Sequence, residues 1–281
     1  MKRQCLAWYQ GAKMLTHPRP EKAQPPRWLD QAPTRRRPRW RLALCVTAAI
    51  AAGGTGAAAD EPRAVVELFT SQGCSSCPPA DKLLGELARD RSLVVASLPI
   101  DYWDYLGWKD TLARPRHTAR QRGYAGVRGD RQVYTPQVVV NGLAHVIGSD
   151  REAIEGAIAR TKAQAPTLTV PVSVNVGADE VTVDINPKKE AEAVAEVWLW
   201  AVATAIPVAV KRGENRGRTV TYHNVVRQWV KLGVWTGAKQ SWTMPRSELQ
   251  AEGIDSVAVI VQSGGPDSPG ALLGATFIPL R

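Results

Sequence analysis

The chain has 281 residues, of which 44% are hydrophobic and 22% are charged, and its formal net charge is +10. That length allows one large domain or two ordinary ones, and the composition excludes a largely disordered chain. Residues 1–59 hold 11 Lys or Arg against two acids, whereas the rest holds 25 basic and 24 acidic residues. The main body therefore lacks the basic surface expected of a nucleic-acid-binding protein.

The first 59 residues are typical of a secretory signal peptide. A basic run at 35–41 precedes an apolar stretch at 42–52, and small residues follow up to Ala59. We therefore predict export to the periplasm or the medium, with cleavage after Ala59. The alternative is a membrane anchor, because the stretch at 42–59 is nearly long enough to span a bilayer. Residues 1–34 are polar and Pro-rich, which favours a start of translation further along the chain, near Leu29.

The mature chain begins with alternating strands and helices. A short apolar run at 64–69 predicts a buried strand, and Leu83, Leu84 and Leu87 predict a helix that follows it closely. Asn141-Gly142 is a strong hairpin signal. Further strands are expected at 93–98, 138–140 and 143–147, and further helices at 111–124, interrupted near Pro115, and after Ser149, which forms a capping box with Glu152.

Beyond about residue 163 the pattern becomes one of strands separated by Gly, Pro and polar residues. Strands are expected at 167–176, 181–185, 194–205, 219–229, 256–262 and 271–278. The basic, Gly-containing segment 212–218 is either a long hairpin turn or a contact with a partner or with the other domain. We therefore predict an α/β domain at 60–162 and a smaller all-β, sandwich-like domain at 163–281.

Two cysteines, Cys74 and Cys77, remain after the predicted cleavage, at a helix N-terminus directly after a strand. Unpaired amides and the helix dipole stabilise an anion there. We expect Cys74, as the outer residue, to have a thiol pKa below the usual value of about 8.5, and to attack disulfides. Cys77 would then resolve the mixed disulfide.

Two other interpretations of the Cys pair remain open. A structural zinc site is not one of them, because zinc usually takes four ligands from two Cys pairs and the mature chain has no second pair. A copper site made from both cysteines and one of His117, His145 or His223 is an alternative, as is a purely structural disulfide.

Four motifs resemble a secreted thioredoxin-like family known as domain of unknown function 1223. They are the segments 66–81, 101–108, 134–137 and 213–218. The resemblance implies a thioredoxin-like α/β fold, with a central sheet flanked by helices, and an exported protein.

The wider resemblance to thioredoxins implies roles for three more residues. Thr135-Pro136 matches the cis-proline position beside the first cysteine, where substrate backbone binds. Glu67 matches a buried acid that accepts the proton of the inner cysteine, although a Glu facing solvent at a sheet edge is the alternative.

An aromatic segment follows the second predicted strand. Tyr102, Trp103 and Trp108 either form the wall of a substrate groove or pack within a loop. Taken together, the sequence predicts an exported thiol–disulfide oxidoreductase, reductase-like or isomerase-like, with no cofactor and no metal. Its partners would be protein thiols or disulfides and a redox partner. The alternative is a non-enzymatic copper-binding or partner-binding module.

Overall fold

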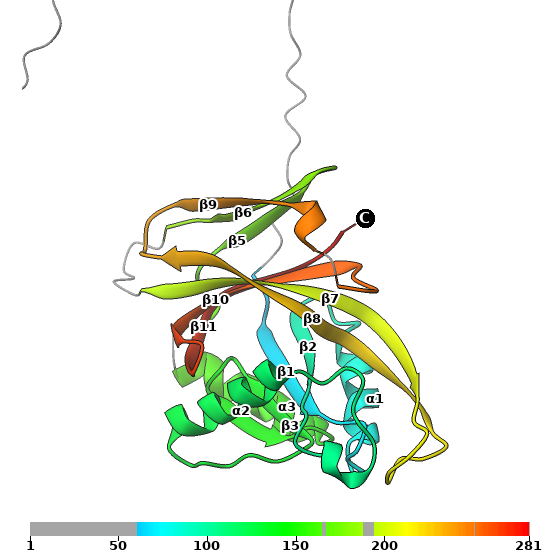
Figure 1. Cartoon of the computed structure of the whole chain (residues 1–281). Helices are drawn as coiled ribbons and strands as arrows, with labels where there is room; N and C mark the ends of the chain where they lie inside the picture. Colours follow the sequence, from blue (N-terminus) through cyan, green and yellow to red (C-terminus); the bar gives the residue numbers. More distant parts are fainter. Residues whose placement is uncertain (1–60, 165–166, 188–193, 250, 281) are drawn as a thin grey trace, which may run out of the picture. The chain divides into compact units, whose positions relative to one another are not determined.

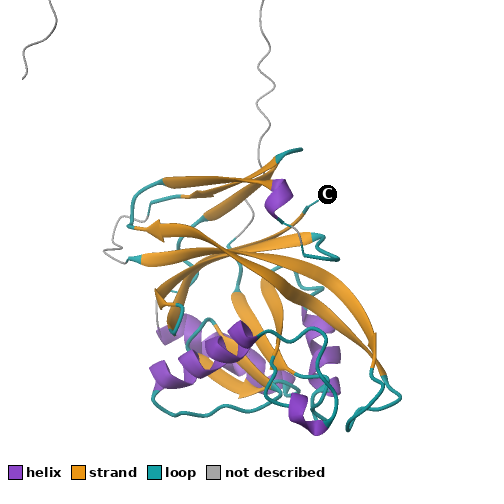
Figure 2. Ribbon diagram, in the orientation of Figure 1, coloured by secondary structure: helices purple, strands orange, loops and turns teal. Residues whose placement is uncertain are grey.

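The computed structural model describes residues 61–164, 167–187, 194–249 and 251–280, all of which fall in one compact unit. The predicted signal peptide and its cleavage site after Ala59 lie outside these residues. The fold is mixed α/β, with one large sheet, a small second sheet and few helices (Figures 1 and 2). No helix in the described part has the length and hydropathy of a membrane span.

The first half of the chain follows the predicted order of strands and helices. Its strands β1 to β4 form one end of the large sheet in the order β2-β1-β3-β4. β1 runs parallel to β2 and antiparallel to β3. The elements are β1 (Ala64–Thr70), α1 (Pro78–Leu87), β2 (Leu93–Pro99), the 3-10 helix η1 (Asp104–Leu106), α2 (Pro115–Arg128), β3 (Gln137–Val140), β4 (Ala144–Ile147) and α3 (Arg151–Gln164).

β1 is the central strand of this half, and all seven of its residues are buried. Because side chains alternate along a strand, Val66 and Leu68 pack on one face with α1 and α3. Val65 and Phe69 pack on the opposite face with Tyr124 of α2. α1 and α2 therefore cover opposite faces of the sheet.

The second half of the chain consists of strands, which extend the same sheet. Its elements are β5 (Val172–Val176), β6 (Glu180–Ile185), β7 (Ala195–Ala209), β8 (Thr219–Trp235), β9 (Gln240–Pro245), the 3-10 helix η2 (Arg246–Glu248), β10 (Ser256–Gly265) and β11 (Ser268–Pro279). β5, β6 and β9 form the small sheet. It packs against β7 and β10 in a sandwich-like core that contains Val183, Leu199 and Val259.

The large sheet joins the two segments that the sequence separates. β8 lies beside β2, with Val225 opposite Ser97, and the full order is β11-β10-β7-β8-β2-β1-β3-β4. The predicted boundary after residue 162 falls within α3. The alternation of apolar residues shows which face of a strand is buried but not which strand lies beside it. The sequence therefore did not predict the pairing of β8 with β2.

Several local features also differ from the sequence predictions. Pro115 starts α2 instead of interrupting it, as its missing N–H allows. Asp150, and not Ser149, caps α3, because its Oδ1 accepts the Ala153 N–H at 2.9 Å. The hairpin at Asn141 is confirmed. Strand β9 was not predicted, and the strand predicted at 167–176 begins only at Val172.

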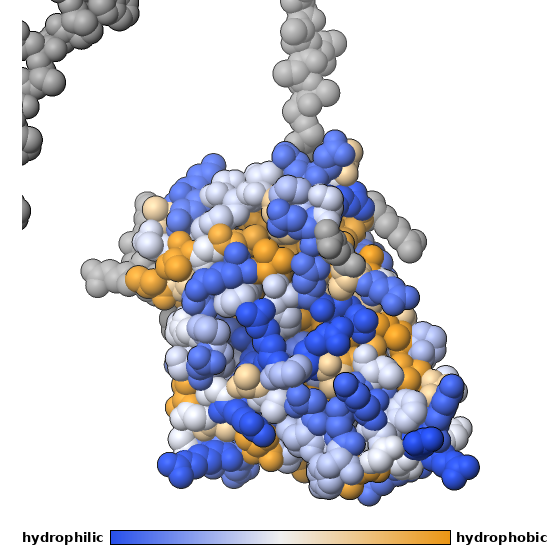
Figure 3. Space-filling view, in the orientation of Figure 1, coloured by the Kyte–Doolittle hydropathy of each residue, from blue (hydrophilic) through white to orange (hydrophobic). Residues whose placement is uncertain are grey.

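The hairpin of β7 and β8 is the longest element pair in the fold. Its strands pair from Ala195 opposite Trp235 to Ala209 opposite Thr219. The hairpin curves away beyond the sheet and past α1 (Figure 1). Its far end is hydrophilic at the lower right of Figure 3, where Lys211, Arg212 and other polar residues are exposed. This end of the hairpin reaches the Cys pair.

Candidate functional site

The Cys pair lies where β1 gives way to α1. Cys74 and Cys77 form a disulfide with a Cα–Cα distance of 5.4 Å. Cys77 is the N-cap of α1, and its carbonyl accepts the Ala80 N–H at 2.8 Å. Pro78 and Pro79 occupy the first turn, where no backbone donor is needed. The predicted arrangement of strand, turn, Cys pair and helix is therefore present.

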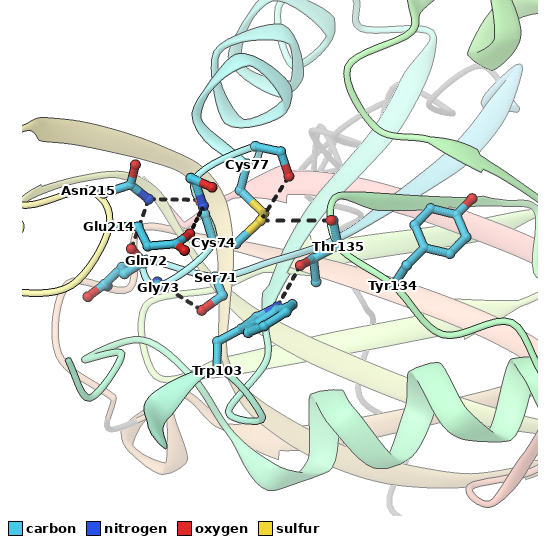
Figure 4. Close-up of a disulfide and its surroundings, with 12 residues drawn as sticks. Ser71, Gln72, Gly73, Cys74, Cys77, Trp103, Tyr134, Thr135, Glu214 and Asn215 are labelled. Atoms are coloured by element: carbon cyan, nitrogen blue, oxygen red, sulfur yellow. Dashed lines mark hydrogen bonds between the residues drawn. A yellow bond between two sulfur atoms is a disulfide. The ribbon is translucent and has the colours of Figure 1, made fainter. Parts of the chain in front are cut away.

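The Thr135–Pro136 segment borders the same disulfide. The peptide bond between the two residues is cis, as the resemblance to thioredoxins implies. The Thr135 carbonyl oxygen lies 3.8 Å from the Sγ of Cys74 (Figure 4). The structure thus brings together four of the predicted site residues.

The aromatic segment packs around this site. The Trp103 indole donates to the Thr135 hydroxyl at 2.7 Å, and the Trp108 indole donates to Oε1 of Gln72 at 2.8 Å. Tyr102 is partly buried, with its ring 5.9 Å from that of Trp103. These three side chains therefore line the site, with both indole donors engaged inside the protein.

Tyr105 was not among the predicted site residues, although it belongs to the same aromatic run. Its side chain is 76% exposed, and its ring stacks on that of Trp103 at 6.1 Å. It is therefore the aromatic of this segment that is most open to a partner.

The tip of the β7–β8 hairpin covers the Cys pair. The Asn215 amide donates to the carbonyl oxygens of Gln72, at 3.0 Å, and Cys74, at 2.8 Å. Glu214 accepts the Ser75 N–H at 3.2 Å, and Figure 4 shows Glu214 and Asn215 beside Cys74. Asn215 is 1% exposed, and Cys74 retains only 4% exposure. Cys74 is the outer cysteine as expected, but it is covered rather than open.

This tip also changes the electrostatics around Cys74. The Glu214 carboxylate accepts a backbone donor in the turn that precedes α1, where the sequence led us to expect only anion-stabilising groups. A nearby negative charge disfavours a thiolate. Glu214 therefore places a carboxylate against the turn that carries Cys74.

Glu67 does not lie where a proton relay to Cys77 requires. Its carboxylate accepts hydrogen bonds from the Arg120 guanidinium, at 2.5 and 2.9 Å, and from the Tyr124 hydroxyl, at 2.6 Å. Both partners belong to α2, so Glu67 points to the sheet face opposite α1. Because Arg120 neutralises the buried charge, Glu67 is part of a structural ion pair.

The buried acid on the α1 side is Asp81, which the sequence reasoning missed. It lies four residues after Cys77, on the same side of the helix. Neither carboxylate oxygen makes a hydrogen bond of good geometry with a described residue, although the Thr70 hydroxyl is close enough to interact with the carboxyl. Burial raises the pKa of Asp81 to about 8, with the hydroxyl of Thr70 opposing the rise and Asp110 adding to it. Asp81 is therefore mainly a neutral carboxylic acid at pH 7.

Asp110 holds the turn before the Cys pair. Its carboxylate accepts the backbone N–H groups of Gln72, Leu112 and Ala113 at 2.7–3.0 Å. Burial raises the pKa of Asp110 to about 6, against the effect of these hydrogen bonds. Asp81 and Asp110 look like ordinary surface acids in the sequence, and only their burial distinguishes them.

The histidines considered as copper ligands lie in separate environments. His117 is buried, with Nδ1 2.9 Å from the Pro99 carbonyl oxygen, and its pKa falls to about 4, chiefly through burial. His145 contacts Tyr134. His223 lies against Gly85 of α1. Among the described residues, no group of three or more His, Cys, Asp or Glu is arranged to hold a metal ion.

The fold and the site together define a mixed α/β protein with a Cys-x-x-Cys disulfide at a helix N-terminus. The family of proteins of unknown function called DUF1223 matches residues 65–262, and the chain belongs to this family.

An Agrobacterium tumefaciens protein solved by X-ray crystallography is similar to this chain. The two are 34% identical, with a TM-score of 0.70 over 79% of this chain and 96% of the other. No curated protein matches the sequence.

Proposed function

We propose that this protein is an exported, thioredoxin-like thiol–disulfide oxidoreductase that acts on protein disulfides through Cys74 and Cys77. The observation that carries the proposal is the disulfide at the start of α1, with the Thr135 carbonyl 3.8 Å from the Sγ of Cys74. The strand order β2-β1-β3-β4, with helices on both faces, supports the thioredoxin-like assignment. The signal-like leader supports export.

In the reducing direction, the reaction consists of two exchange steps. The Cys74 thiolate attacks one sulfur of a substrate disulfide, forming a mixed disulfide and releasing a substrate thiolate. The Cys77 thiolate then attacks the Sγ of Cys74, which releases the second substrate thiolate and forms the Cys74–Cys77 disulfide. The substrate gains two electrons, and a dithiol redox partner supplies the next pair. No bound cofactor takes part.

Other residues of the site have supporting roles in this proposal. The Thr135 backbone pairs with an extended substrate segment beside Cys74, and Tyr105 and Trp103 offer an aromatic surface to it. Asp81 takes the place in the mechanism that the sequence assigned to Glu67. Its pKa of about 8 is close to that of an ordinary thiol, so it is suited to exchange a proton with Cys77.

Trapping of mixed disulfides tests the proposal. A Cys77→Ala variant should accumulate covalent complexes with exported proteins through Cys74, and reducing agent should release them. A Cys74→Ala variant is the matched control, because it keeps one cysteine but lacks the attacking one. Absence of complexes, together with tight copper retention by the reduced wild-type protein, would favour the copper-binding alternative.

A further inference from the structure

A groove of about 740 Å³ runs between α1 and the end of β8 that approaches the hairpin tip. On the α1 side it is lined by Pro78, Lys82 and Arg89, among others, and on the β8 side by residues 218–221 and 223. Pro78 directly follows Cys77. The groove therefore leads away from the Cys pair along the helix.

The groove is positively charged. Lys82, Arg89 and Arg218 are exposed cations along it. Lys82 and Arg89 form no ion pair with any described residue. The one carboxylate in the lining, Glu86, pairs with Arg151 at 2.7 Å, which compensates its charge. The lining therefore favours an acidic ligand.

The β8 side of the groove presents an unpaired strand edge. Residues 219–223 pair with β7 on one side, and within the described strands β2 meets β8 only at Val225. Every second residue of such an edge directs its N–H and C=O groups away from its partner strand. An extended segment can add to this edge.

The floor of the groove depends on Gly85. A Cβ at this position would lie 2.4 Å from the His223 ring, so only glycine lets that ring lie against the helix. The helix side is about 15 Å long, because α1 has 10 residues. About five residues of extended chain cover that length.

We propose that this groove binds an extended, acidic segment of the substrate protein, which adds to the β8 edge and directs carboxylates to Lys82, Arg89 and Arg218. The leader of this chain is not the occupant, since residues 1–59 are strongly basic. The proposal deepens the proposed function, because it gives disulfides next to acidic, extended segments as the preferred substrates.

A binding experiment without redox chemistry tests the groove by itself. The probe is a short fluorescent peptide without cysteine, in which Glu alternates with Thr; in the comparison peptide, Gln replaces each Glu. Wild-type protein should bind the Glu peptide about tenfold more tightly than the Gln peptide at low ionic strength, and lose this preference at high salt. Equal binding of both peptides would overturn the proposal.

Two variants and two modified peptides locate the site. Lys82→Glu/Arg89→Glu should lose the preference, whereas Arg160→Glu/Lys162→Glu, with the same charge change on exposed residues of α3, should keep it. Two further peptides carry N-methyl groups on every second peptide bond, starting from the first bond in one peptide and from the second bond in the other. At least one of these two registers should bind more weakly, because it blocks the N–H groups that pair with the strand edge. Equal losses in both variants, or no effect of N-methylation in either register, would overturn the proposal. The proposal would also be overturned if the protein self-associates and the Lys82→Glu/Arg89→Glu variant does not, because a second copy of the chain would then occupy the groove.

A second arm adds redox chemistry. A peptide disulfide flanked by Glu should be reduced faster than its Gln counterpart by wild-type protein, and this ratio should fall in Lys82→Glu/Arg89→Glu. If the Glu peptide binds but neither disulfide is reduced, the groove stands and the proposed oxidoreductase function fails. If both disulfides are reduced equally fast, the groove does not select substrates, and this proposal fails alone.

Discussion

Replacing Asp81 with Asn should change how the stability of the protein depends on pH. Asp81 is 1% exposed, and burial raises its pKa from 3.8 to about 8. The folded state therefore keeps a proton on Asp81 that the unfolded chain releases above about pH 4. The stability contribution of this group is full below that pH and falls as pH rises towards about 8.

The size of the effect follows from the width of that interval. Each pH unit between the two pKa values lowers the free energy of unfolding by about 1.4 kcal/mol. At pH 7 the total is up to about 4 kcal/mol for this single carboxyl. Asp81→Asn removes the titration and keeps the shape, so the variant should gain stability relative to wild type as pH rises. If the Asn amide packs less well than the carboxyl, the free energy of unfolding of the variant is lower by the same amount at every pH, and the pH dependence is unaffected.

The assay is denaturant unfolding of wild type and Asp81→Asn with the disulfide intact, from about pH 4.5 to about pH 8. The difference in the free energy of unfolding should grow by about 3 kcal/mol between pH 4.5 and pH 7. Asp90→Asn is the control, because hydrogen bonds from Ser92 hold the pKa of Asp90 below its usual value, so Asp90 stays ionised over this interval. A constant difference for Asp81→Asn would refute the reasoning.

Three further predictions concern the site and the ion pair beneath it. Asn215→Ala removes the two hydrogen bonds to the carbonyl oxygens of Gln72 and Cys74, so it should cost about 2 kcal/mol of stability and speed reduction of the disulfide by a small-molecule thiol. An unchanged rate would mean that the hairpin tip does not restrict access to the disulfide. Glu67→Gln should lower the free energy of unfolding by about 3–5 kcal/mol, because it leaves the buried Arg120 guanidinium without its counter-ion. The rate of thiol–disulfide exchange should stay the same. A slower exchange would mean that Glu67 does relay protons. In the reduced protein, alkylation at about pH 6 should label Cys74 before Cys77, and peptide mass spectrometry would detect the opposite order.

Sequence reasoning succeeded where the signal is local. The Cys pair, the prolines that start α1 and the Asn141 hairpin each follow from a few adjacent residues, and the structure contains all three. The cis bond before Pro136 came from a family resemblance. The local signal failed at Ser149, where two neighbouring residues can both cap a helix and Asp150 does so.

What the sequence did not indicate depends on residues far apart in the chain. Asn215 lies 141 positions from Cys74, and Arg120 lies 53 positions from Glu67. Glu67 was correctly expected to be buried, but its partner decides whether it relays protons or forms an ion pair. The burial of Asp81 could not be predicted from the sequence, because an acid in the first turn of a helix is common on protein surfaces. Only its burial sets it apart.

The shared sheet has a consequence for the order in which the chain is made. Synthesis proceeds from the N-terminus, so both cysteines and strands β1 to β4 emerge from the ribosome before β8 exists. Until β8 arrives, β2 is an open sheet edge, and the cysteines lack the cover of Asn215. A nascent chain that stops before residue 195 thus carries an accessible dithiol and an aggregation-prone edge. Completion of the final third of the polypeptide places β8 beside β2 at Ser97 and Asn215 over Cys74.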